Sequence, residues 1–151
     1  MAAESSDGAA SAESTSEGEP IGAFDLAARG AVALVLSVVG TVVVLEAVLA
    51  GDLVEPFDAT AVQPVVLLTT LAVVGATVVY GVLTRRSPTP DRTFVRVAAI
   101  VLVLSFVPDL ALLELDPEAT ASGVALLAFL HVVVAVICVT VLTDDYSPRS
   151  P

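Results

Sequence analysis

The chain has 151 residues, of which 56% are apolar, and it carries seventeen acidic residues against six basic ones. A domain of this size cannot bury so much apolar surface in water, which excludes an ordinary soluble globular protein. All six basic residues are arginines and the net charge is −11, a balance suited to concentrated salt, so we expect an extreme halophile as the source. The single cysteine excludes an internal disulfide.

The chain begins with a polar tail. Residues 1–24 contain five acids, no base and no periodic apolar face, and they are predicted to be disordered. The tail lacks the basic start and short apolar core of a secretory signal, so no cleaved leader is expected.

Four apolar stretches follow, each long enough to cross the roughly 30 Å hydrocarbon core of a bilayer. They cover about 30–49, 63–83, 95–113 and 123–142, within one membrane domain at 25–143. Residues 144–151 include two prolines and are predicted to form a short flexible tail. The sequence therefore predicts an all-α integral membrane four-helix bundle, built from two helical hairpins.

The arginines predict the orientation of this bundle. Loops 50–62 and 114–122 contain acids and no base. The arginines lie before the first span, in the loop between the second and third spans, and in the C-terminal tail, at Arg29, Arg85, Arg86, Arg92, Arg96 and Arg149. Because short loops rich in Arg remain cytoplasmic, we expect a multi-pass protein of the cell membrane with both termini in the cytoplasm. Tyr80 is expected near the cytoplasmic interface, where its ring and hydroxyl suit the headgroup region.

Three ionisable residues inside the predicted spans are candidates for chemistry, and all three are in the half of the membrane away from the arginines. They are Glu46, Asp109 and His131. Ionisable groups are costly in hydrocarbon and usually face the bundle interior or a water-filled cavity. These three are therefore the candidates for a functional site.

Helical phase supports Asp109 best. It shares one stripe with Ala98, Leu102 and Ser105, at spacings of four, three and four, so small and polar residues lie on one face. Pro108 is expected to kink the helix where Asp109 turns inward. His131 shares a stripe with Ala135 and Cys138.

Glu46 fits such a site less well. It lies opposite Ser37, which forms a small-residue packing face with Ala33 and Thr41, so Glu46 is expected to reach the outer interface. For Asp109 and His131 a structural role stays open beside a functional one, because His131 could simply hydrogen-bond across to Ser105 or to a backbone carbonyl.

The common catalytic and nucleotide-binding motifs are absent from the sequence. We accordingly expect no catalytic residues, no cofactor, no metal site and no nucleic-acid partner, and an enzyme is the least favoured class.

Three segments resemble a family of small prokaryotic four-span membrane proteins of unknown function. They are VAAIVLVLSFVPD, ending at Asp109, GVALLAFLHV, which contains His131, and the closing VLT at 141–143. The resemblance covers about 25–143. It implies four helices and draws attention to Asp109 and His131, but it brings no activity.

Two functions remain open. The first is a structural or interaction component of the cell membrane, in contact with the lipid bilayer and with either further copies of itself or another membrane protein. The second is a transport or proton-relay protein, or a subunit of one, that uses Asp109 and His131. Four short spans leave little room for a transport path, so the second function requires an oligomer or a partner.

Overall fold

The computed structural model describes residues 22–143. The predicted tails lie outside these residues, apart from 22–24, and so does Arg149. Within the described range the chain forms four helices, α1 (Ala23–Ala50), α2 (Val62–Arg86), α3 (Pro90–Leu115) and α4 (Ala121–Leu142), and one short 3-10 helix, η1 (Asp58–Thr60). Each of the four long helices is long and apolar enough to cross a membrane, which confirms the predicted all-α membrane fold.

The helices extend past the predicted apolar spans at most of their ends. α3, for example, begins at Pro90, and proline suits the first helical turn because the N–H that it lacks would have no partner there. The helix therefore includes the charged residues Asp91 and Arg92 before the predicted apolar stretch begins. Hydropathy marks the part of a helix that is dissolved in hydrocarbon, and the backbone hydrogen bonds continue beyond it.

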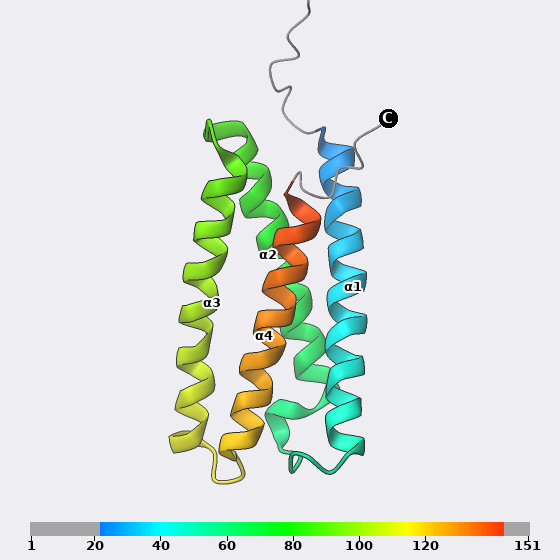
Figure 1. Ribbon diagram of the computed structural model, residues 1–151, viewed down its shortest axis with the longest axis vertical. Coiled ribbons are helices and arrows are strands. Elements are labelled where there is room, and N and C mark those ends of the chain that lie inside the picture. The colour runs from blue at the N-terminus through cyan, green and yellow to red at the C-terminus, as the bar shows by residue number, and fades with distance from the viewer. Residues whose placement is uncertain (1–21, 144–151) are drawn as a thin grey trace, which may run out of the picture.

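The two ends of the bundle differ in charge. The basic end contains all the arginines in the described range, Arg29, Arg85, Arg86, Arg92 and Arg96. The acidic end contains the connections at 51–61 and 116–120, in which Asp52, Glu55, Asp58, Asp116 and Glu118 lie. Figure 1 shows that α1 begins and α4 finishes at the same end of the bundle, as two successive hairpins require.

Helix α4 is the central element. It packs against α1, α2 and α3, whereas α3 packs against α4 and, less extensively, against α2 (Figure 1). A helix with so few polar residues can take such a position, and α4 is the most deeply buried of the four helices. α3 is the least buried, so most of its surface is left to lipid or to another protein.

The face of α1 that packs into the bundle is the one predicted from its small residues. Ala33, Ser37 and Thr41 are fully buried, together with Leu45. Gly30 lies on the same face against Thr77 of α2, and a Cβ atom at Gly30 would be only 2.7 Å from the Thr77 Cγ2 atom. Small side chains therefore allow α1 and α2 to approach closely.

Tyr80 lies in the last turns of α2, at the basic end, and is fully buried within the bundle. Its hydroxyl donates a hydrogen bond of 2.7 Å to Asp91 Oδ1, and its ring meets Phe94 edge-on with the centroids 5.1 Å apart. The first turns of α3 fold back over the ring and supply a partner for its hydroxyl, so the side chain can be buried at the basic end without an unpaired polar group.

The 51–61 connection also closes the acidic end. Thr60 Oγ1 donates to the carbonyl of Phe57 and accepts from the Phe57 N–H, at 2.8 and 2.9 Å. This turn directs the Phe57 ring into an apolar cluster with Leu126 and Leu127 of α4. The ring rests on Gly123, where a Cβ atom would lie 2.5 Å from Phe57 Cε1.

Candidate functional site

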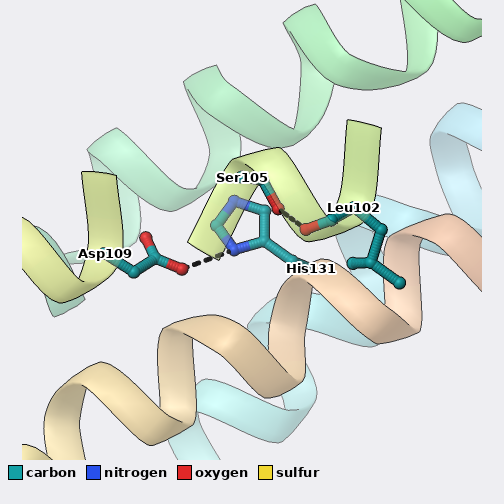
Figure 2. A network of polar contacts seen from close by, with 4 residues as sticks. All are labelled: Leu102, Ser105, Asp109 and His131. Carbon is teal, nitrogen blue, oxygen red and sulfur yellow. Dashed lines mark hydrogen bonds and ion pairs between the residues drawn. The ribbon is translucent and has the colours of Figure 1, made fainter. Parts of the chain in front are cut away.

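Asp109 of α3 and His131 of α4 meet between these two helices. Asp109 Oδ2 lies 3.0 Å from His131 Nδ1, as Figure 2 shows. The Asp109 side chain is 9% exposed and the His131 side chain 36% exposed, so the acid lies inside the helix pair while the imidazole reaches its surface. Both residues are nearer to the acidic end of the bundle than to the basic end.

The sequence brings the two residues together through the stripe on α3. Ala98, Leu102, Ser105 and Asp109 are half-buried or buried, while Val101, Leu104 and Val107 between them are exposed. The predicted face therefore turns towards the bundle. Pro108 is exposed within one continuous helix, so its missing N–H lies on the outer side of α3.

The contact between the acid and the histidine is an ion pair by distance, and it lacks the alignment of a regular hydrogen bond. Among the described residues neither Asp109 Oδ2 nor His131 Nδ1 has a hydrogen-bond partner. Ser105, which was considered as a partner for His131, donates its hydroxyl hydrogen bond to the carbonyl of Leu102 at 2.7 Å (Figure 2). Each member of the pair therefore has the other as its principal polar neighbour.

Glu46 is not part of this site. It is exposed on α1, and α1 packs against α2 and α4 on its opposite side. Of the three ionisable residues singled out in the spans, the structure brings together Asp109 and His131 and leaves Glu46 at the surface of the bundle.

The arginines at the basic end take two different positions. Arg85, Arg86, Arg92 and Arg96 are exposed. Arg29 is half-buried, and its Nη1 atom donates to the carbonyl of Leu142 at 3.2 Å, at the C-terminal end of α4. A cation at this position also interacts favourably with the negative end of the helix dipole.

A cleft beside Asp109 is a feature that the sequence reasoning missed. It lies between α3 and α4 towards the acidic end, and its volume is about 340 Å³. Its lining is apolar except for Asp109, and consists of Phe106, Asp109, Leu110 and Leu113 from α3 and of Ala121, Val124, Ala125 and Ala128 from α4. The cleft could have been recognised in the sequence from Ala121, Ala125 and Ala128, which follow at spacings of four and three. Small side chains on one face of a helix leave space beside it.

The chemistry open to this site is limited by its groups. Within residues 22–143 no three side chains of His, Cys, Asp or Glu gather closely enough to hold a metal ion. A carboxylate and an imidazole in contact can hold a proton between them, exchange it, or accept a cation.

Fold and site together define a protein of four candidate membrane helices with an acid–histidine pair between two of them. The chain belongs to the family of unknown function DUF6069, whose family model matches residues 22–147, and this confirms the resemblance to an uncharacterised family. Comparisons with curated proteins and with solved structures give no match.

Proposed function

We propose that this is a small multi-pass protein of the cell membrane, with both termini in the cytoplasm, that acts as a structural or interaction component. Its partners are the lipid bilayer and either further copies of the chain or another membrane protein. The Asp109–His131 pair then holds α3, the least buried helix, against α4.

The observation that carries this proposal is the apolar interior between the pair and the basic end. Buried side chains of all four helices fill it, among them Val73, Val134 and Cys138. Several hydroxyls in the spans bond to carbonyls of their own helix, those of Thr41, Thr70, Thr77, Ser105 and Thr140. Each of these five hydroxyls therefore has a partner on its own helix.

A flux measurement tests this proposal. The full chain is reconstituted into liposomes that contain a pH-sensitive dye, and an imposed pH difference is allowed to decay. If the protein is an interaction component, the pH difference should decay at the same rate as in empty liposomes, because an apolar core offers a proton no path. A faster decay that the His131→Gln change abolishes would contradict it.

A second measurement tests the interaction itself. A photoreactive side chain is placed in turn at Leu71 and Leu104, which are exposed on α2 and α3. Irradiation of native membranes should give a defined adduct from at least one position. Lipid adducts alone from both positions would count against a protein partner on these two helices.

The pair itself favours a second function, a proton relay or transport protein that works as an oligomer or with a partner. The exposed part of the His131 ring supports it, because that part could pass a proton to a group on a neighbouring chain. In the flux measurement this function predicts the opposite result, a decay that is fast and depends on both Asp109 and His131.

A further inference from the structure

We propose that the cleft between α3 and α4 binds an apolar molecule that carries one ammonium group, and that its ammonium binds to Asp109 while His131 releases a proton. This inference goes beyond the proposed function and does not depend on it.

The lining of the cleft selects the class of ligand. Asp109 is its one ionisable residue, and the remaining lining is aliphatic or aromatic side chains. An uncharged apolar ligand would cover a carboxylate without giving it a hydrogen bond, and an anion would be repelled by it. An ammonium supplies both the N–H donors and the opposite charge.

One oxygen atom of the Asp109 carboxylate, Oδ1, is available to bind this ligand. Oδ2 lies against His131 Nδ1, whereas Oδ1 points away from the imidazole in Figure 2. An ammonium on Oδ1 therefore leaves the contact with His131 in place. Phe106 lines the same cleft, and the face of an aromatic ring attracts a cation.

Charge balance predicts the proton release. An ionised Asp109 beside a doubly protonated His131 is neutral as a pair, which suits a site among apolar helices. An added ammonium would leave one net positive charge there. The charge returns to zero when His131 loses the proton of Nε2, the ring nitrogen that is turned away from Asp109, and this proton passes to the solvent (Figure 2). Nδ1 keeps its proton and still faces Oδ2.

The chain provides a specific readout, because His131 is its only histidine. Protein labelled with ¹⁵N at histidine is placed in phosphatidylcholine nanodiscs, at the pH at which half of the imidazole is protonated. Octylammonium is then titrated in. We expect the doubly protonated ¹⁵N signals to disappear in a saturable manner, and octanol to have no such effect. Below that pH the apparent affinity should weaken by about tenfold per pH unit, because one proton is exchanged per ligand.

Three variants complete the experiment. Asp109→Asn removes the anion and should abolish the response. Ala125→Leu fills the cleft without altering the pair, and it should also abolish the response; it thereby controls for the positive charge that octylammonium brings to the bilayer. Glu46→Gln removes an exposed acid elsewhere in the spans and should respond like the unchanged protein.

The proposal is overturned if octylammonium leaves the His131 signals unchanged, or if Ala125→Leu responds as strongly as the unchanged protein. The Ala125→Leu and octanol results decide the matter even where Asp109→Asn does not fold. None of these outcomes bears on the flux or crosslinking tests, so failure of this inference and failure of the proposed function are separate results.

Discussion

At the scale of single residues, the stability of the Asp109–His131 pair depends on the balance between electrostatic attraction and the cost of desolvation. Both groups lose hydration between the helices, yet the imidazole keeps 36% of its surface exposed and the acid only 9%. Removing one partner leaves the other without its principal polar neighbour, and an unpaired buried acid is the more costly remainder. Ordinary interhelical hydrogen bonds in membranes average only about 0.6 kcal/mol, which gives a standard for the strength of this pair.

A double-mutant cycle measures that strength. Asp109→Asn and His131→Gln should each lower the free energy of unfolding by about 1–3 kcal/mol, because each change leaves a polar group poorly paired. The double variant should lose less than the sum, with a coupling above about 1 kcal/mol. Unfolding in mixed micelles of increasing denaturing detergent provides the measurement.

The same cycle with Glu46→Gln in place of Asp109→Asn serves as its control, and it should show no coupling, since Glu46 is exposed on another helix. Additive effects of Asp109→Asn and His131→Gln would mean that the 3.0 Å contact contributes nothing to stability.

At the scale of helices and loops, close packing depends on where glycine lies. Gly30 faces α2, and a Cβ atom there would meet Thr77, whose hydroxyl is held by a 2.8 Å hydrogen bond to the Val73 carbonyl. Gly75 is exposed on α2 and has nothing within 4 Å of the same position. Glycine is therefore needed for close packing at position 30 and is not needed for packing at position 75.

Alanine substitutions should separate these roles. Gly30→Ala should lower the free energy of unfolding by about 1–3 kcal/mol, because Thr77 cannot turn away without losing its hydrogen bond. Gly75→Ala should leave stability unchanged or raise it by up to about 1 kcal/mol, since alanine is the better helix former. Detergent unfolding of the two variants side by side checks this, and equal effects would show that α1 and α2 do not pack at Gly30.

The 51–61 connection offers a similar comparison. Phe57 is 6% exposed and rests on Gly123, whereas Leu53 in the same connection is 71% exposed. Phe57→Ala should cost about 3–5 kcal/mol, as for other buried aromatic residues, and Leu53→Ala should cost almost nothing. If proteolysis within residues 51–61 is no faster in Phe57→Ala than in Leu53→Ala, the loop is not held by its aromatic ring.

The sequence predicted the buried faces of single helices better than it predicted the contacts between helices. The small-residue spacings on α1 and the stripe that ends at Asp109 correctly identified buried faces, since helical period alone determines which residues share a side. The burial of Tyr80 was not predicted, because its partner Asp91 belongs to the next helix and only the tight turn between the two helices brings them together. The cleft was missed for a related reason, as its lining comes from two helices, α3 and α4, whose placement relative to each other does not follow from the spacing within either one.

At the scale of the whole molecule, charge divides the bundle into two ends while the spans between them are nearly neutral. All five arginines of the described range lie at one end, and the connections at the other end contain acids and no base. The helix arrangement alone does not distinguish the two orientations in the membrane, so the expected orientation rests on the distribution of the arginines. If the basic end is cytoplasmic, the Asp109 cleft is nearer to the outer surface.

Labelling with a membrane-impermeant thiol reagent tests the orientation. In a Cys138→Ala background, which removes the one native thiol, single cysteines are placed at Asp58 and Glu118 in the acidic connections and at Thr89 in the basic one. All three positions are exposed, so differences in labelling report the side of the membrane and not burial.

In intact cells the reagent should modify the cysteines at positions 58 and 118 and spare the one at position 89, because arginine-rich loops stay in the cytoplasm. After the cells are opened, Thr89→Cys should react as well, which shows that its thiol is available. Labelling of Thr89→Cys alone in intact cells would reverse the orientation and place the Asp109 cleft towards the cytoplasm.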